Sequence, residues 1–292
     1  MKKKNLKKST KQKINSPKAL GEDHYEYLHG YSSTEQKRLF EQAQFYEQSV
    51  YEDIDWPKGA LQILEPGCGV GAQSDILMRR FPQLNLSCVD RSPEQLKTAQ
   101  KYHQKNMKQG RVKFYKGEAT ELPLGESSHD GAFVCYLLEH VPKPAEVLAE
   151  IHRVLKPGAK IYCTEVFNAA FYLAPYAPAT LKYYFEFNDH QWETGGNPFM
   201  GAHLGSLLSD AGFKQIQTKM IYFQLDKRTP KQRTEHCNFF LKLLESASPE
   251  LLKTKRVTPS LIKEVKNEWV KAANDPDSIL FYSMIQASAV AL

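Results

Sequence analysis

The chain has no long hydrophobic run and no paired cysteine motif. No apolar stretch among its 292 residues approaches the ~20 residues of a membrane-spanning helix, and no signal-peptide core lies near the start. Its five cysteines include no C-x-x-C pair, and most lie in apolar, strand-like segments. We therefore expect reduced thiols in a cytoplasmic protein with no membrane partner and no bound metal.

Positive charge is concentrated at the beginning of the chain. Residues 1–15 contain seven lysines and no acidic residue, while the net charge of the whole chain is only +6, so the remainder is close to neutral. Residues 1–20 have no apolar periodicity, and we expect a disordered, lysine-rich tail. The basic pI thus comes from the tail and not from a folded basic surface. We expect the tail to be solvated and nucleic acid not to be a partner; weak binding of the tail to nucleic acid or to an anionic membrane is the alternative.

Strand-like and helical patterns alternate through the middle of the chain. Apolar runs typical of strands occur, with helical segments between them, at 61–65, 84–89, 112–115, 131–136 and 160–166. This order predicts an α/β protein with a doubly wound, mostly parallel sheet over residues 57–166. In such sheets, ligands bind beyond the carboxyl ends of the strands.

The pattern changes after residue 166. Residues 167–212 hold nine aromatics between Phe167 and Trp192 and predict a helical cap that could roof a pocket. Two strand-like segments, 214–224 and 279–291, lie within residues 213–292, with a helical insertion at 231–273 between them. We expect these two strands to close the sheet as an antiparallel pair and residues 21–56 to form an N-terminal helical lid.

A glycine-rich loop follows the first strand. Residues 65–71 read E-P-G-C-G-V-G, and glycines there permit a tight turn with positive φ and close contact between backbone and ligand. A dinucleotide fingerprint instead reads G-x-G-x-x-G and places a pyrophosphate on a helix N-terminus. Taken alone, the loop indicates only a nucleotide-like ligand.

Three further features follow the ends of the next strands in order. Asp90 ends the second strand, where an acidic side chain can accept hydrogen bonds from both hydroxyls of a ribose. Residues 117–119, Gly-Glu-Ala, follow the third strand, where a carboxylate can reach an adenine amino group. Residues 136–140, Tyr-Leu-Leu-Glu-His, follow the fourth strand at the mouth of the expected crevice.

Together these elements resemble the class I S-adenosyl-L-methionine (SAM)-dependent methyltransferases, above all the UbiE-like small-molecule subset. The resemblance covers about residues 25–225, with matching pieces at 65–71, 89–90, 117–124, 130–133, 138–141 and 155–159. The family fold is a Rossmann-like sheet of seven strands, the last of them antiparallel. The resemblance implies SAM as the cofactor and S-adenosyl-L-homocysteine (SAH) as its product.

The resemblance also implies which residues bind SAM. Gly67 and Gly69 would pack against the ligand, and Asp90 would bind its ribose. Glu118 would lie beside the adenine, and the backbone of Tyr136 beside the methionine part. The complete set assigned to the cofactor is Glu65, Gly67, Cys68, Gly69, Gly71, Asp90, Arg91, Gln95, Glu118, Ala119, Tyr136 and, from the lid, Tyr27.

Transfer of the SAM methyl group requires that the acceptor's nucleophilic atom be positioned against it. Where that atom carries a proton, a general base is also needed. Positioning at near-attack distance should supply most of the acceleration. A general base adds about 10²–10⁴-fold. His140 is the first candidate, because an imidazole titrates near neutral pH, and Glu139 is the second. Alternatively, His140 only packs against the turn before Pro142.

Two motifs of enzymes that methylate nucleic-acid bases are absent. Residues 136–139 read Tyr-Leu-Leu-Glu in place of an Asn/Asp-Pro-Pro-Tyr run, and no cysteine follows a proline. We therefore expect a small organic acceptor, apolar or aromatic, methylated on O, N or C. Two alternatives stay open: a catalytically silent SAM-binding scaffold protein, and an RNA or protein methyltransferase that uses the lysine tail. The oligomeric state has no signature in the sequence.

Overall fold

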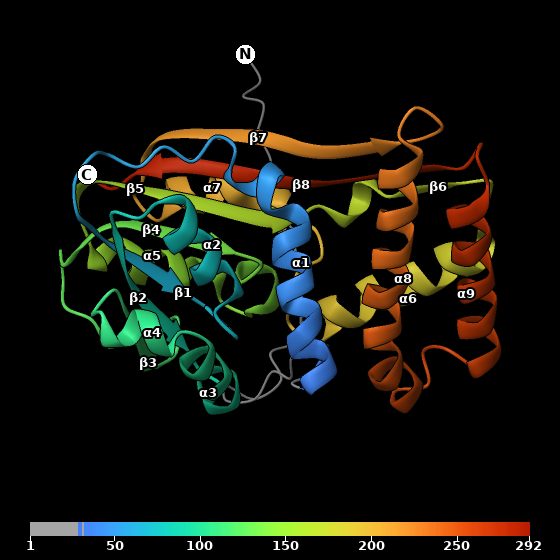
Figure 1. The fold of residues 1–292 in the computed structure, drawn as a ribbon, viewed down its shortest axis with the longest axis horizontal. Coiled ribbons are helices and arrows are strands. Elements are labelled where there is room, and N and C mark those ends of the chain that lie inside the picture. The colour runs from blue at the N-terminus through green and yellow to red at the C-terminus, as the bar shows by residue number, and fades with distance from the viewer. Residues whose placement is uncertain (1–28, 31) are drawn as a thin grey trace, which may run out of the picture.

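A computed structural model describes residues 29–30 and 32–292. In this part of the chain, eight strands form one sheet in the order β3-β2-β1-β4-β5-β8-β6, and β7 pairs with β8 (Figure 1). The strands are β1 (Leu61–Pro66), β2 (Leu84–Asp90), β3 (Val112–Lys116), β4 (His129–Cys135), β5 (Leu155–Val166), β6 (Tyr172–Ala174), β7 (Lys214–Leu225) and β8 (Ile279–Val290). Strands β1 to β5 are parallel, and β8 runs antiparallel to β5, β6 and β7. The predicted α/β class and the antiparallel closing pair are confirmed.

The sheet departs from the expected seven strands by one short strand. β6 has three residues and pairs with the beginning of β8, where Tyr172 lies opposite Phe281. Three residues are too few for an alternating pattern to be recognised in a sequence. The sequence therefore did not predict β6, which lies within residues 167–212, the segment predicted as a cap.

Helices cover both faces of the sheet, as the doubly wound pattern predicts. The helices are α1 (Ser33–Tyr51), α2 (Ala72–Arg80), α3 (Pro93–Tyr102), α4 (Gln104–Lys108), α5 (Pro144–Val154), α6 (Pro178–Glu193), α7 (Leu204–Asp210), α8 (Pro230–Lys253) and α9 (Pro259–Asn274). Residues of α1, α2 and α3 share one hydrophobic core, and residues of α5 and α7 share the other. None of the helices in the described part is long and apolar enough to cross a membrane.

The insertion between β7 and β8 is the helix pair α8 and α9. Figure 1 shows this pair with α6 at the end of the molecule opposite to β3, α3 and α4. Phe240 of α8 stacks on Trp269 of α9 with ring centroids 5.5 Å apart, and Trp269 is 1% exposed. The predicted insertion is therefore confirmed, and it has an aromatic core that continues the core of the sheet.

A cap residue fixes the start of α9. The Thr258 hydroxyl accepts the backbone N–H of Leu261 at 3.2 Å, which satisfies a donor that the first turn leaves unpaired. We expect Thr258→Ala to lower the free energy of unfolding in urea by about 1 kcal/mol. Ser260→Ala is the matched control, because its hydroxyl bonds only to the Glu264 side chain on the exposed surface. Equal stability of the two variants would contradict the role of this cap.

Candidate active site

The glycine loop is held in place by the end of β2. The N–H groups of Gly67 and Cys68 both donate to the Val89 carbonyl, at 2.7 and 3.2 Å. Gly67 and Gly69 have φ angles of 69° and 51°, in the left-handed region that glycine adopts without strain. A Cβ on Gly67 would lie 2.7 Å from Leu137, whereas a Cβ on Gly69 would enter open space. Gly69 is thus the point at which the loop leaves room for a ligand.

Asp90 joins this loop to the start of α3. One carboxylate oxygen accepts the N–H of Gly69 and the other accepts the N–H of Ser92, both at 2.8 Å. Burial raises the pKa of Asp90, and these two N–H donors oppose the rise. Each carboxylate oxygen has a further lone pair, so the side chain can accept two more hydrogen bonds from a ligand.

One cavity joins the predicted cofactor residues to a second group of side chains. Its lining includes most of the residues assigned from the sequence, namely Gly67, Cys68, Gly69, Asp90, Arg91, Gln95, Glu118, Ala119, Tyr136, Glu139 and His140. Gln95 is 4% exposed, and its Oε1 has no hydrogen-bond partner among the described residues. Because buried acceptors in proteins are normally paired, this oxygen points to a donor on a ligand.

Two of the predicted cofactor residues in the described part of the chain, Glu65 and Gly71, do not line the cavity. Glu65 is buried behind the loop, where its carboxylate accepts the Ser74 hydroxyl at 2.5 Å and the Cys88 thiol at 3.4 Å. Burial raises the pKa of Glu65 to about 7. A Cβ on Gly71 would lie 2.8 Å from the His103 ring, so this glycine serves packing within the protein. Tyr27 lies outside the described residues.

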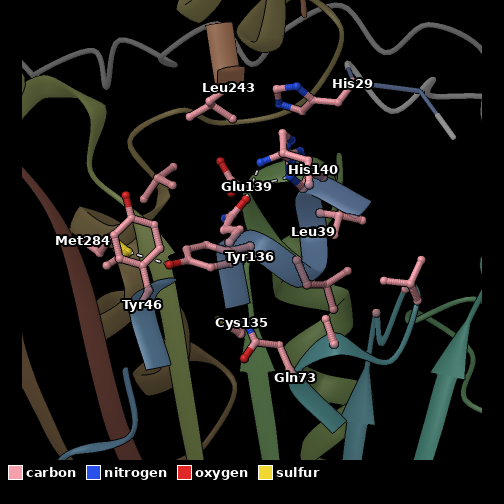
Figure 2. Close-up of a pocket in the computed structure, with 18 of the residues that line it drawn as sticks. His29, Leu39, Tyr46, Gln73, Cys135, Tyr136, Glu139, His140, Leu243 and Met284 are labelled. Atoms are coloured by element: carbon pink, nitrogen blue, oxygen red, sulfur yellow. Dashed lines mark hydrogen bonds and ion pairs between the residues drawn. The ribbon is translucent and has the colours of Figure 1, made fainter. Parts of the chain in front are cut away.

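The second half of the cavity is lined mainly by aromatic and aliphatic side chains. They come from α1, α6, α8 and β8, and the set is Leu39, Tyr46, Tyr184, Phe187, Phe239, Phe240, Leu243, Leu244, Tyr282 and Met284. Figure 2 shows Leu39, Tyr46, Leu243 and Met284 around the space above Tyr136. We call this half the acceptor half and the half beside the glycine loop the cofactor half.

The sequence identified few of the acceptor-half residues. Of the nine aromatics between Phe167 and Trp192, only Phe167, Tyr184 and Phe187 line the cavity. For the residues from α1 and α8, the apolar periodicity of the sequence predicts a helix but no pocket, because a helix buried in an ordinary core has the same pattern. Only a polar residue within these apolar patterns would have distinguished the wall of a pocket from an ordinary core in the sequence.

Tyr136 divides the two halves of the cavity. Its φ of 55° is rare for a bulky residue, and it turns the chain from β4 into the short 3₁₀ helix η1 (Leu138–His140). Its N–H donates to the Thr164 carbonyl at 3.0 Å, and its hydroxyl donates to the Met284 sulfur at 2.7 Å. Such backbone strain is typical of functional sites.

A buried carboxyl group that sequence reasoning missed supports this turn. Glu165 of β5 is 0% exposed and accepts three backbone N–H groups, from Leu137, Leu138 and Glu139, at 3.0, 2.8 and 3.1 Å. Burial and the nearby charge of Glu139 raise the pKa of Glu165 to about 8. Glu165 therefore fixes the backbone that carries Glu139 and His140.

Glu139 and His140 lie side by side on η1 and face the cavity (Figure 2). The Nε2 atom of His140 is 3.5 Å from Oε1 of Glu139, and the Gln191 amide donates to Oε2 of Glu139 at 3.2 Å. Burial raises the pKa of Glu139 to about 7. Burial, with Arg38 and Arg91, lowers the pKa of His140 to about 4. At neutral pH the imidazole of His140 is therefore uncharged. The carboxyl group of Glu139 is then close to its pKa, so its protonated and charged forms are both populated.

Comparison with known proteins agrees with this geometry. A family model described as a methyltransferase domain matches residues 64–163, which run from β1 through the glycine loop to β5. Demethylmenaquinone methyltransferase from Listeria welshimeri is 30% identical over 169 residues, which cover 53% of this chain and 71% of that relative. The chain belongs to the class I SAM-dependent methyltransferases.

Other relatives of this methyltransferase chain match over a smaller share of their length. O-methyltransferase rstn1 from Aspergillus nomiae is 30% identical over 156 residues, 53% of this chain. The chain spans 65% of that relative and 54% of O-methyltransferase cnsE from Penicillium expansum. Phosphoethanolamine N-methyltransferase 2 from Haemonchus contortus shares the fold, with a TM-score of 0.55 and 17% identity over 87% of this chain and 57% of that chain.

SAM is the cofactor of this family, and the cofactor half fits it. The unpartnered Gln95 oxygen and the two Asp90 oxygens offer acceptors for hydroxyl or amino groups of a nucleoside. The open space at Gly69 would be filled by any side chain larger than hydrogen. The site thus combines nucleoside acceptors with close backbone contact.

Proposed function

We propose that this chain transfers the methyl group of SAM to a small, mainly apolar acceptor whose nucleophilic atom carries a proton. The observation that supports this proposal is the continuity of the cavity, which leads from Asp90 past Tyr136 to an apolar space beside Glu139 and His140. The bound cofactor supplies an electrophilic methyl group. The residues of the chain align the acceptor with it and remove the proton.

In the cofactor half, we assign Asp90 to the ribose hydroxyls and Glu118 with Ala119 to the adenine. Gln95, with its unpartnered oxygen, is a further ligand contact. Glu65 supports the loop from behind through Ser74 and does not itself touch the cofactor. These roles place the methyl donor against Gly69 and Tyr136, at the boundary between the two halves.

In the acceptor half, the apolar lining selects the body of the substrate. Aromatic and aliphatic side chains bind a molecule through buried area, and a few polar groups fix its orientation. The relatives named above include O-methyltransferases and an enzyme for demethylmenaquinone. We therefore favour a hydroxyl on an aromatic or other apolar ring as the nucleophile.

The pair Glu139 and His140 is assigned to the proton transfer. Burial raises the pKa of Glu139 to about 7, so near neutral pH this carboxyl group can carry the negative charge that a protonated imidazole beside it requires. His140 would contact the hydroxyl, and Glu139 would stabilise the charge that develops on the imidazole. Both residues are positioned by the three hydrogen bonds that Glu165 accepts from η1 and the residue before it.

The direct test measures SAH formation with matched pairs of acceptors. Each pair shares one aromatic ring system and carries either a free hydroxyl or its methyl ether. We expect SAH with the hydroxyl member of at least one pair and none with the ether. Binding of SAH in calorimetry without turnover on any pair would overturn the proposal in favour of a silent SAM-binding scaffold.

A second test fills the acceptor half. We expect Leu243→Trp to raise the KM for the acceptor at least about tenfold, since a larger side chain in a packed pocket displaces the ligand. The Kd for SAH should stay unchanged, because Leu243 lies in the acceptor half (Figure 2). Leu252→Trp is the matched control, because Leu252 lies on the same helix and is 37% exposed. A Leu243 variant with wild-type KM would contradict the assigned pocket.

A further inference from the structure

A folded basic face lies at the β3 edge of the sheet. Residues 95–117 contain seven lysine and arginine residues and no aspartate or glutamate. These residues form most of α3, all of α4 and β3, which Figure 1 shows together at one end of the molecule. The chain without its tail is close to neutral overall, but positive charge is concentrated in this region. The expectation that the basic charge comes only from the tail was therefore wrong.

The lysines of this region are all exposed, although Lys113 and Lys116, three residues apart in β3, extend to opposite sides of the sheet. Arg111 is used within the fold, where its guanidinium donates to the carbonyls of Met78 and Leu84. The six lysines are exposed and form no ion pair with the described residues: Lys97, Lys101, Lys105, Lys108, Lys113 and Lys116. Their charges are therefore available to an anionic partner. The positive charges repel one another until such a partner binds.

Two large apolar side chains lie among these lysines. Tyr102 at the end of α3 is 52% exposed, and Met107 of α4 is 37% exposed. Lys101, Lys105 and Lys108 flank them in the sequence. A surface that combines lysines with exposed aromatic and aliphatic groups is typical of segments that rest in a lipid headgroup region.

The basic face adjoins the wall of the cavity. The Tyr102 ring packs on Phe40 of α1 with centroids 4.6 Å apart, and the preceding residue, Leu39, lines the acceptor half. Gln95, at the other end of α3, lines the cofactor half. A partner bound to this face would therefore lie beside the helices that enclose the site.

We propose that the face made by α3, α4 and β3 docks this chain on the surface of an anionic lipid bilayer. The unpaired lysines supply attraction to anionic headgroups, worth about fivefold in affinity per lysine. Tyr102 and Met107 supply apolar contact that a purely ionic partner would not use. An apolar acceptor partitions into such a bilayer, so docking would bring the cavity to its substrate. The sequence argued against a membrane partner only because no segment can span one.

The test compares binding of the full chain to vesicles of phosphatidylcholine alone and of phosphatidylcholine mixed equally with phosphatidylglycerol. We expect the full chain to sediment with the mixed vesicles only, and binding to weaken as salt rises. The variant Lys101→Gln/Lys105→Gln/Lys108→Gln should bind about 100-fold more weakly. The control Lys227→Gln/Lys263→Gln/Lys271→Gln removes three exposed lysines away from this face and should bind like the wild type. Both variants keep the lysine-rich residues 1–20, so any contribution of these residues to vesicle binding is the same in both.

Three results would overturn the proposal. The first is equal loss of vesicle binding in both triple variants, which would indicate net charge and not this face. The second is wild-type binding by the α3–α4 variant, which would assign vesicle binding to another part of the chain. The third is tighter binding of a single-stranded RNA oligomer than of vesicles, lost in the same variant. Unchanged SAH affinity and an unchanged melting temperature of the variant would establish that its fold is intact.

Discussion

Replacing Asp90 with alanine should weaken the binding of SAH by at least about 100-fold. The carboxylate holds the loop through the N–H groups of Gly69 and Ser92 and offers its remaining lone pairs to the ribose. A hydrogen bond to a charged group contributes about 1.5–3 kcal/mol, so the loss of two costs at least about 3 kcal/mol. Isothermal titration of SAH into each variant measures this loss directly.

A second carboxylate in the same sheet provides the control for Asp90. Asp130 in β4 accepts a backbone N–H from Gln62 at 2.8 Å and an ammonium from Lys156 at 2.7 Å, and it does not line the cavity. Asp130→Ala should therefore bind SAH like the wild type, although it loses comparable hydrogen bonds. Asp90→Asn keeps one carbonyl acceptor and should fall between the two. Wild-type affinity of Asp90→Ala would exclude its assignment to the ribose.

Replacing Glu139 with glutamine should lower kcat by about 10²–10⁴-fold and change the pH profile. Burial raises the pKa of Glu139 to about 7, so the carboxyl group holds a proton below that pH and is charged above it. Wild-type kcat/KM should therefore rise with pH through about 7 and then level off. In the glutamine variant the rise due to Glu139 should be absent, because burial lowers the pKa of His140 to about 4 and its imidazole is neutral throughout this range. Glu165, whose pKa is also raised, does not line the cavity.

The companion variants separate proton transfer from binding. His140→Ala should lower kcat to a similar degree, since the two side chains act together, while both variants keep the SAH affinity of the wild type. Glu146→Gln removes an exposed carboxyl group on α5 and should change neither kcat nor the pH profile. A glutamine variant of Glu139 that retains the rise near pH 7 would assign the proton to another group.

The fold was predictable where the signal is local. Each strand of the parallel core is an apolar run of several residues, and α3 begins with a serine whose hydroxyl accepts the N–H of Gln95. Such patterns are complete within one short window of sequence. β6 was missed because its three residues are ordered only by pairing with Leu280 and its neighbours in β8, more than a hundred residues away.

The cofactor half could be predicted better than the acceptor half for a related reason. Gly69 and Asp90 follow consecutive strands, so the fold itself brings them to one edge of the sheet. The acceptor half instead combines α1, α6, α8 and β8, whose contacts arise only from packing between distant segments. Glu165 was missed because one acidic residue at the end of an apolar strand does not reveal that it will accept three backbone N–H groups.

The position of β8 in the chain sets the order in which the site can assemble. This strand supplies Tyr282 and Met284 to the cavity and pairs with β5, β6 and β7, yet it is made after all of them. During synthesis the cofactor half, built from β1 to β5, can form while the acceptor half still lacks a wall. Before residue 290 emerges, β5 and β7 have open edges that invite intermolecular pairing. A nascent chain would therefore gain its affinity for the nucleoside before its ability to enclose an acceptor.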